Sequence, residues 1–540
     1  MLARWPWIAT LLLAACAQVR EPTGGEQDKA GPALTESTPV LGSTGFVGDR
    51  IVLRFSERVQ LKSMRENLVV SPPPAIAPTV RLLGDHSVQI GLEAPLLPNT
   101  TYVFDYANGV VDLTESNAAA DVPFVLSTGA VIDSAALQVH VSEARTGQAT
   151  DVVEVLLYAE GDTCDPRNCL PAYFARTDDH GRAHVRYMRP GRYRVFALRD
   201  KNGNHRYDLP NEEIAMGDSA VFAVNNVQHL PGDTLVGSDS SLVTPPVQLR
   251  MFTALDTVQR LLDARMVDGA LRVALSRPAT TVELIPLSGD HGTGQWIPEW
   301  NNSADTVRFW YTGIDSLPQH TMLVRVDSVP MDTAAIVQRK ASPPLRVFRV
   351  PYTGSGGWQI EATRLVGFID TAHMTLVKDS IAIPFTFSLS PGHLRRFQVN
   401  AGLKPGEKAV FHLYPGALAD HQRRTNDTLD LDLTMSNAKE VGNLNVTLPA
   451  GINGYHGAYV LELLDANGKA LLTASGAALP DTVHWPALPP KAYALRLVED
   501  ENANGRWDTG SVHDDRQPER ALLHPKGATV RAGWEVETVW

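Results

Sequence analysis

Short runs of alternating polarity, separated by turn residues, recur along the whole chain. Each run is rich in Val, Leu, Phe, Tyr and Thr and is bounded by Gly, Pro, Asn or Asp, the pattern of half-buried strands. Six such runs are residues 50–55, 101–105, 154–158, 192–198, 306–311 and 492–498. Regular strands at this spacing predict an all-β protein built from sandwich domains.

Helices have little room in this chain. The 37 Pro and 41 Gly residues are spread along its length, and both residue types interrupt helices. We predict only one short helix, over residues 257–265. The 540 residues exceed the roughly 250 to 300 at which a single core stops growing, so several domains are expected.

The N-terminus has the pattern of an exported protein. Arg4 precedes an apolar run over residues 5–15, which is shorter than the roughly 20 residues of a membrane span and predicts a signal peptide over residues 1–15. The run ends in Leu13-Ala14-Ala15-Cys16, which resembles the bacterial lipobox. The resemblance implies that the Cys16 sulfur is acylated; an ordinary signal peptide that contains a cysteine is the alternative.

Residues 16–35 are predicted to be a disordered tether, because they contain few large apolar side chains to bury. No later stretch approaches roughly 18 uninterrupted apolar residues, so the lipid is the expected membrane anchor. Ala17 rather than Asp follows Cys16, which by resemblance to lipoprotein sorting implies the outer membrane. No acidic cluster follows Cys16, which favours the periplasmic face and leaves the cell surface open.

The charge balance argues against two classes of partner. A formal net charge of -12 and a pI near 5.7 do not attract nucleic acid or anionic lipid. We therefore expect no nucleic-acid partner. The apolar share of 44% and the charged share of 20% are ordinary for globular domains.

Cys164 and Cys169 are the two cysteines that remain after Cys16. They flank a short polar turn, and an oxidising envelope compartment favours a disulfide between them. A metal site there would need two further ligands, and no Cys or His cluster lies nearby in the sequence. A metal or redox role is the less favoured alternative.

Five sequence blocks near the N-terminus carry a family resemblance. They are DRIVLRFSERV (49–59), LVVSP (68–72), LPNTTY (97–102), VDL (111–113) and FVLSTG (124–129). In this order they resemble the bacterial Ig-like domain of the SbsA type, which implies a β-sandwich over residues 36–130. Ig-like sandwiches serve as spacers, adhesins and binding modules alike, so the resemblance does not specify a function.

The next segment, residues 131–234, contains TDDHGRA (177–183) and MRPGRYRV (188–195). These blocks resemble the transthyretin-like or carboxypeptidase-regulatory-like sandwich. The residues themselves predict two hairpin turns, at Gly181 and Gly191, since glycine accepts the positive φ that such turns require.

The same segment matches the C-terminal region without a gap. The aligned pairs are Pro190 with Pro490, Tyr193 with Tyr493, Asp200 with Asp500, Asn202 with Asn502, Asn204 with Asn504, Arg206 with Arg506, Tyr207 with Trp507 and Asp208 with Asp508. We therefore predict a second copy of this sandwich over residues 438–540. Two further β domains are expected between the copies, over residues 235–352 and 353–437, and repetition of a two-domain unit stays open.

Both copies contain an Asp-x-Asn-x-Asn-x-Arg-aromatic-Asp loop. Side-chain oxygens at alternate positions of a curled loop converge on one point, which suits calcium. The candidate ligands are the side chains of Asp200, Asn202, Asn204, Asp208, Asp500, Asn502, Asn504 and Asp508, with the carbonyl oxygens of Arg206 and Arg506. Unlike an EF-hand, the twelfth position is Asn211 or Ser511, and His205 replaces Gly505. Glu212, Glu213 or Asp514 could complete the ligand set; the alternative is a solvated turn.

Motifs of hydrolases, metalloproteases and nucleotide-binding proteins are missing from the sequence. The run SGDHGTG (288–294) places Asp beside His, but adjacent residues point apart and the glycines indicate a loop tip. Trp296, Trp300 and Trp310 could form an aromatic platform for a glycan, although strand alternation favours Trp310 as core.

The order of lipobox, Ig-like domain and transthyretin-like domain resembles Ig-like-domain lipoproteins of the Bacteroidota, a family that implies no enzymatic activity. We predict a non-catalytic envelope lipoprotein that acts as a structural or interaction module, with an envelope protein or glycan as partner. A glycan-binding accessory protein is the first alternative. A hydrolase with its site in the central β domains is the second.

Overall fold

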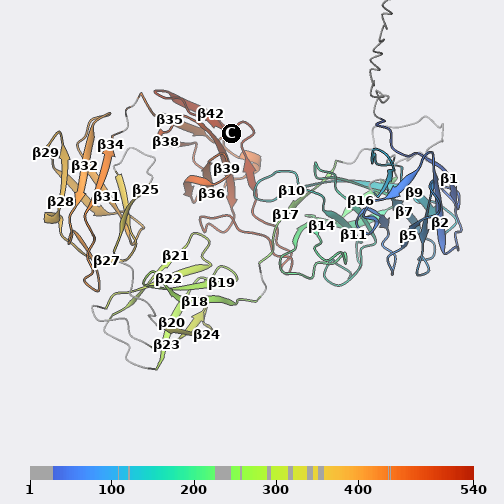
Figure 1. Cartoon of the computed structure of the whole chain (residues 1–540), viewed down its shortest axis with the longest axis horizontal. Coiled ribbons are helices and arrows are strands. Elements are labelled where there is room, and N and C mark those ends of the chain that lie inside the picture. The colour runs from blue at the N-terminus through green and yellow to red at the C-terminus, as the bar shows by residue number, and fades with distance from the viewer. Residues whose placement is uncertain are drawn as a thin grey trace, which may run out of the picture.

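The computed structural model confirms a chain of β-sandwich domains (Figure 1). It describes residues 28–106, 109–119, 122–225, 245–255, 258–288, 294–313, 320–336, 345–350, 358–435, 437 and 439–540. Strand pairing groups these residues into five domains, which we number in chain order: domain 1 (28–129), domain 2 (132–252), domain 3 (258–336), domain 4 (345–437) and domain 5 (439–540). Within these ranges, no helix is both long and apolar enough to cross a membrane. The predicted signal peptide and Cys16 lie outside the described residues.

Domain 1 packs two sheets against each other, with strand orders β1-β2-β6-β5 and β4-β7-β9, and adds a short β3–β8 pair. Its elements are β1 (Leu34–Thr38), β2 (Arg50–Phe55), β3 (Val59–Leu61), α1 (Met64–Asn67), β4 (Val69–Ser71), β5 (Thr79–Leu82), β6 (Ser87–Gly91), β7 (Thr101–Asp105), β8 (Val110–Asp112) and β9 (Phe124–Ser127). Alternate residues of β2, namely Ile51, Leu53 and Phe55, enter the core between the sheets.

Domain 3 repeats the two-sheet order of domain 1, as β18-β19-β22-β21 and β20-β23-β24. Its strands are β18 (Leu261–Val267), β19 (Ala270–Leu275), β20 (Val282–Ser288), β21 (Trp296–Trp300), β22 (Thr306–Tyr311), β23 (His320–Val326) and β24 (Val329–Ile336).

Domain 4 repeats that order again, as β25-β26-β31-β30 and β28-β32-β34, with the short strand β29 added beside β28, and it also has the short extra pair, β27–β33. Its elements are β25 (Val347–Val350), β26 (Trp358–Ala362), β27 (Val366–Ile369), η2 (Thr371–His373), β28 (Met374–Lys378), β29 (Ile381–Ala382), β30 (Phe385–Leu389), β31 (Arg396–Ala401), β32 (Lys408–Leu413), β33 (Leu418–Asp420) and β34 (Leu429–Thr434). Three of the five domains therefore share one topology.

Domain 2 belongs to a second topology, with eight strands. They are β10 (Ala135–Glu143), β11 (Glu154–Ala159), β12 (Tyr173–Arg176), β13 (Arg182–Met188), β14 (Gly191–Arg199), β15 (Glu213–Met216), β16 (Val221–Asn225) and β17 (Val247–Met251). The first strand pairs with β13 and, in parallel, with β17, while β14 pairs with β11, β15 and β16.

Domain 5 repeats these pairings strand for strand. Its elements are β35 (Gly442–Thr447), η3 (Ile452–Gly454), β36 (Ala458–Leu464), β37 (Ala470–Gly476), β38 (Thr482–Leu488), β39 (Ala492–Asp500), β40 (Ala521–Leu523), β41 (Ala528–Thr529) and β42 (Glu535–Val539). Here β35 pairs with β38 and, in parallel, with β42, while β39 pairs with β36, β40 and β41. The aligned tyrosines make the same hydrogen bond. The hydroxyl of Tyr193 donates to the carbonyl of Arg189 at 2.7 Å, and the hydroxyl of Tyr493 donates to the carbonyl of Pro489 at 2.9 Å. The sequence match thus reflects a duplicated fold, and the chain reads as a repeated two-domain unit with domain 3 between the copies.

Four predictions about local structure are wrong. The turns at Gly181 and Gly191 do not form hairpins, because β13 pairs with β10 rather than with β12 or β14. Gly181 has the expected positive φ of 72°, whereas Gly191 is not at positive φ and begins strand β14.

The helix predicted over residues 257–265 is replaced by strand β18, which forms a hairpin with β19 through Asp268 and Gly269, both at positive φ. An Asp-Gly pair is a strong hairpin signal, and pairing with β19 overrides the modest helix propensity of the segment. The tether predicted over residues 16–35 ends early, because β1 begins at Leu34 and pairs with β2 as an edge strand.

Two strands belong to a different domain from the one that the expected boundaries gave them. Val247–Met251 (β17) follows the boundary expected at residue 234, yet it pairs with β10 and completes domain 2. Val347–Val350 (β25) precedes the boundary expected at residue 352, yet it pairs with β26 in domain 4. Composition does not mark these positions, because membership of a domain depends on backbone pairing with a distant strand.

The outer faces of the two duplicated domains differ in polarity. The register that sets Leu156 opposite Phe196 in domain 2 sets Glu462 opposite Arg496 in domain 5. Arg496 donates to the carboxylate of Glu462 at 2.6 Å. The outer face of domain 2 is therefore apolar and needs a cover, whereas domain 5 carries a buried ion pair at the same place.

Domain 5 supplies part of that cover. Val512, from the loop between β39 and β40, packs into the apolar cluster on the outer face of domain 2. Hydrogen bonds from Thr509 to the Thr253 carbonyl and from Gln517 to the Met216 carbonyl, both 2.8 Å, hold the loop in place. The chain thus folds back, so that domain 5 lies beside domain 2 (Figure 1).

Domains 3 and 4 also pack through a buried contact. Trp310 of β22 is only 4% exposed and lies against Leu365 of domain 4. Its indole N–H donates to Glu299 at 2.8 Å, and Arg395 of domain 4 both stacks on the indole ring and bonds to Glu299. Trp310 is therefore buried, as predicted, but at the contact between domains 3 and 4.

Replacing Val512 by Asp is expected to release the loop from domain 2, because an unpaired carboxylate cannot enter an apolar cluster without a large desolvation cost. The full chain should then expand, which small-angle X-ray scattering would record as a larger radius of gyration. Val512→Ala, which keeps the site apolar, is the control and should change the radius much less. An unchanged radius in a folded Val512→Asp protein would contradict the docking.

Candidate functional site

The two Asp and Asn loops fold around their first aspartate. In domain 2 the Asp200 carboxylate accepts the backbone N–H groups of Asn202, Gly203 and His205, at 3.0, 2.7 and 2.7 Å. In domain 5 the Asp500 carboxylate accepts those of Asn504 and Gly505 at 3.0 and 2.8 Å. The structure thus brings the predicted residues together, with this aspartate as the cap of the turn.

The second aspartate gathers the asparagine side chains. The amide nitrogens of Asn202 and Asn204 donate to the two carboxylate oxygens of Asp208 at 3.0 and 2.7 Å. Asn502 and Asn504 also donate to Asp508, both to its Oδ2 atom, at 2.5 and 2.6 Å. The asparagine oxygens accept backbone N–H groups of the loop instead.

A buried glutamate closes each loop. Glu212 accepts the backbone N–H groups of Lys201 and Asp208, at 3.1 and 3.0 Å, and Glu519 accepts those of Glu501 and Asp508, at 3.0 and 2.8 Å. Sequence reasoning named Glu212 among three candidates and missed Glu519. The usable signal is position: each glutamate lies one or two residues before the strand that follows the loop.

The other two candidates for this closing role lie elsewhere. Glu213 accepts from Arg199 at 2.6 Å, and Asp514 accepts from the hydroxyl of Ser511 at 2.8 Å. For Arg206 and Arg506, the sequence predicted that the backbone carbonyl oxygens are ligands. In the structure, the side chain of Arg506 has contacts of its own: it pairs with Asp508 at 3.3 Å and donates to the Ser303 carbonyl of domain 3 at 3.2 Å.

His205 adopts the positive φ that its glycine counterpart adopts in domain 5. The φ angles are 57° at His205 and 76° at Gly505. The ring bonds to Glu154 at 2.7 Å and lies 4.7 Å from the ring of Phe174. Burial lowers the pKa of His205, but the bond and charge of Glu154 outweigh it and raise that pKa above its usual value. The side chain is thus bound to the domain 2 core, which offsets the cost of its backbone conformation.

The loop of domain 5 is longer than its copy. Asp208 and Glu212 are four positions apart, whereas Asp508 and Glu519 are eleven apart, so the second loop has seven additional residues. This extension contains Val512, which docks on domain 2, and also Ser511, His513, Asp514 and Arg516.

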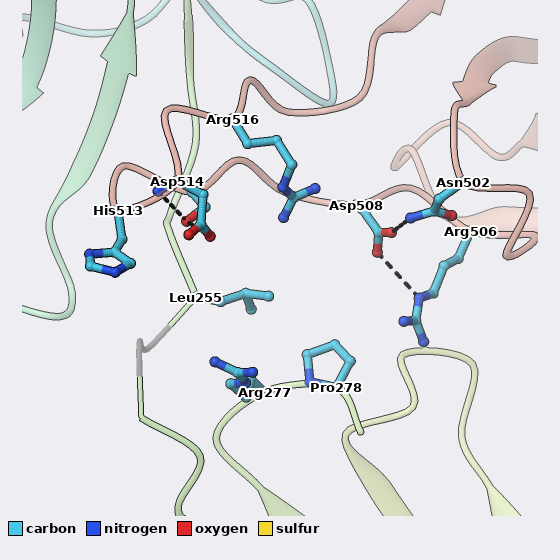
Figure 2. A pocket seen from close by; sticks show the side chains of 10 residues that line it. Leu255, Arg277, Pro278, Asn502, Arg506, Asp508, His513, Asp514 and Arg516 are labelled. Carbon is cyan, nitrogen blue, oxygen red and sulfur yellow. Dashed lines mark hydrogen bonds and ion pairs between the residues drawn. The ribbon is translucent and has the colours of Figure 1, made fainter. Parts of the chain in front are cut away.

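A cavity of about 600 Å³ opens beside this extension, where domain 5 meets domain 3 and the segment that leads into it (Figure 2). Domain 5 contributes the Asp and Asn loop and the extension; domain 3 and the preceding segment contribute an arginine, a proline and a leucine. The lining residues are Leu255, Arg277, Pro278, Asn502, Arg506, Asp508, Ser511, His513, Asp514 and Arg516. This cavity is the candidate functional site, and its size is in the range of small-molecule sites.

Ser511, His513 and Asp514 line the cavity together, but their contacts do not form a nucleophile and base. The Ser511 hydroxyl donates to Asp514 at 2.8 Å, so its proton faces a carboxylate rather than an imidazole. An activated serine needs its hydroxyl within hydrogen-bond reach of the base.

The remaining predicted sites have mixed outcomes. Cys164 and Cys169 form the predicted disulfide, with their Cα atoms 5.3 Å apart. Trp296 and Trp300 are half-buried against the domain 3 core, and Trp310 is buried at the domain 4 contact, so the three do not form an exposed aromatic row. Most of the 288–294 run lies outside the described residues.

Comparison with known proteins places domain 1 in a family. The model of a bacterial Ig-like domain (Big_5) matches residues 28–128. No curated protein matches the chain.

Three solved structures that resemble the chain share little sequence with it. An L,D-transpeptidase from Mycobacterium smegmatis is 12% identical, with 29% of this chain and 76% of that one covered and a TM-score of 0.14. The S-layer protein rSbsC is 12% identical, with 93% and 67% covered and a TM-score of 0.14. The major pilin subunit of Bacillus cereus is 10% identical, with 75% and 98% covered and a TM-score of 0.14. Scores this low carry no conclusion about what this chain does.

The closing glutamate of domain 5 generates a pH prediction. Two backbone N–H donors favour its charged form, but burial and the neighbouring charges of Asp508 and Asp500 outweigh them and raise the pKa of Glu519 to about 7. The folded domain therefore holds a proton that the unfolded chain, with a pKa near 4.5, releases. The unfolding free energy should fall as pH rises from about 4.5 to about 7.

Glu519→Gln, which mimics the protonated form, should remove this part of the pH dependence. Urea unfolding of the full chain at several pH values between 4.5 and 8 would measure it. Glu440→Gln, an exposed glutamate in the same domain, is the control and should keep the wild-type slope. Equal slopes in Glu519→Gln and wild type would contradict the assignment.

Proposed function

We propose that this protein is a non-catalytic structural and interaction module of the bacterial cell envelope. Domain 1 is a bacterial Ig-like domain in an array of β-sandwiches, an architecture suited to spacing and presenting surfaces. In the finer proposal, the chain is an outer-membrane lipoprotein of the Bacteroidota type, held by a lipid on Cys16 and facing the periplasm. Domain 1 is then of the SbsA type, and domains 2 and 5 are transthyretin-like.

The observation that carries this proposal is the fixed packing between domains. Domain contacts within a chain are often small and polar, and then allow free relative motion. Here the contact between domains 2 and 5 buries Val512 and Phe252, and the contact between domains 3 and 4 buries Trp310. Surfaces on such an array keep constant relative positions, as a scaffold requires.

The glycan-binding alternative loses its original support, because the three tryptophans on which it rested pack into domain 3 and its interface with domain 4. The hydrolase alternative places its site in the central β domains, so the contact between Ser511 and Asp514 in domain 5 does not bear on it. An envelope protein therefore remains the proposed partner, and its identification requires purification of the lipoprotein together with what it binds.

Lipid anchoring can be tested by replacing Cys16 with Ser and fractionating the cells. The variant cannot be acylated and should move from the membrane to the soluble fraction, since a lipid chain supplies the expected membrane affinity. Cys164→Ser is the control, because it removes a cysteine distant from the lipobox. A Cys16→Ser protein that still sediments wholly with membranes would contradict the anchor.

Calcium binding at the two loops stays a prediction, with the role of rigidifying them. The donor set is rich in oxygen, but the asparagine amides now point their nitrogens at Asp208 and Asp508. Binding would require these amides to turn so that their oxygens face the ion. Calcium at about a hundredfold its Kd should then add roughly 2.7 kcal/mol of stability.

Thermal scans of the full chain with excess calcium and with chelator would measure this effect. Asp208→Ala should remove the part that belongs to domain 2, and Asp508→Ala the part that belongs to domain 5, because the two loops are separate. Superimposable scans of the wild-type protein would show that the loops are turns alone.

A further inference from the structure

The cavity beside the domain 5 extension combines cationic, polar and apolar side chains. Arg277 comes from domain 3, while Arg506 and Arg516 come from domain 5, and His513 lies on the same wall (Figure 2). With the carboxylates of Asp508 and Asp514 also in the lining, the cavity has a formal charge of +1 when His513 is neutral, in a protein whose net charge is -12. Such a local reversal of charge attracts anions that the rest of the surface repels.

Within the part of the chain that the structure describes, neither aspartate of the cavity forms a hydrogen bond or ion pair with the Arg516 side chain. The carboxylate of Asp508 is occupied by Asn502, Asn504 and Arg506. Asp514 accepts from Ser511 at 2.8 Å. The guanidinium of Arg516 makes no hydrogen bond or ion pair with the part of the chain that the structure describes, and it extends from the loop toward Leu255 (Figure 2). Its donors thus face the cavity.

The other lining groups favour a ligand with hydroxyl groups and a carbon ring. The carboxylate oxygens of Asp514 can accept hydroxyl protons, and the amide oxygen of Asn502, which accepts the Asn504 N–H, has a second lone pair that can do the same. Leu255 and Pro278 supply apolar surface on the opposite side.

The cavity also depends on the sequence extension. Four of its lining residues, Ser511, His513, Asp514 and Arg516, lie within the stretch that lengthens this loop relative to domain 2. The extension therefore does two things: Val512 docks on domain 2, and its neighbours turn toward domain 3.

We propose that this cavity binds a small anionic saccharide, a sugar that bears a carboxylate or a phosphate group. Arg516, with Arg277 and His513, holds the anionic group, because planar guanidinium groups match carboxylate and phosphate oxygens. Asp514 and Asn502 accept ring hydroxyls, and Leu255 and Pro278 contact the ring. The site goes beyond the proposed scaffold role, which does not depend on it.

The test is isothermal titration calorimetry of the full chain with three probes: glucuronate, glucose 6-phosphate and glucose. At least one anionic sugar should bind saturably, and glucose, which lacks the charge, should bind at least tenfold more weakly. The two anionic probes distinguish a carboxylate from a phosphate ligand. Equal affinity for all three, or no binding by either anionic sugar, would overturn the proposal.

Arg516→Ala should weaken binding of the anionic sugar at least tenfold, because it removes the charge that faces the cavity. Arg531→Ala, an exposed arginine of the same domain outside the cavity, should leave the affinity unchanged. Arg516 is exposed, so the variant should fold, which its thermal melt would verify; His513→Ala should give a smaller loss. Equal affinities in the Arg516→Ala and Arg531→Ala proteins would also overturn the site. If the Arg516→Ala protein has the wild-type radius of gyration, the loss of binding leaves the arrangement of the domains unchanged.

Discussion

The apolar outer face of domain 2 is the surface on which the arrangement of the chain depends. Leu156, Tyr158 and Phe196 project from this sheet away from its own core, and together they would expose a contiguous apolar patch to water. Val69 of domain 1 and Val512 of domain 5 cover it, together with the segment that holds the Cys164–Cys169 disulfide. One patch thereby connects domains that are far apart in sequence, and the hydrophobic effect that folds each sandwich also sets their relative positions.

Duplication and divergence explain the rest of the interface. Domains 2 and 5 share strand pairings and the Tyr193 and Tyr493 bonds. At the face where domain 2 is apolar, however, domain 5 has the Glu462–Arg496 pair. The two faces therefore cannot play the same role: one needs a cover and the other does not. Arg145 of domain 2 approaches Glu462 at 3.7 Å, so the polar face also contributes to the contact.

The seven-residue extension is the second consequence of divergence. In domain 2, Glu212 bonds to the backbone of Asp208 and closes the loop four residues after it. In domain 5, the chain leaves the loop after Asp508 and returns eleven residues later at Glu519, which bonds to the backbone of Asp508. The excursion presents Val512 on one side and Arg516 on the other. The same turn chemistry thus serves as a stable base from which a longer loop can reach two other domains, and the cavity lies at that junction.

The sequence by itself determined the class of fold, the duplicated sandwich, the disulfide and the grouping of Asp200 with Asn202, Asn204 and Asp208. These features are local: alternation, turn residues and short spacings control them within a few residues. It missed the β18 hairpin, the return of β17 to domain 2, and Glu519, and it did not reveal that domains 3 and 4 repeat the topology of domain 1. The cavity and the contacts between domains were decided by the tertiary structure alone. They join residues such as Arg277 and Arg516 that are hundreds of positions apart, and burial between distant segments leaves no periodic signal in either one.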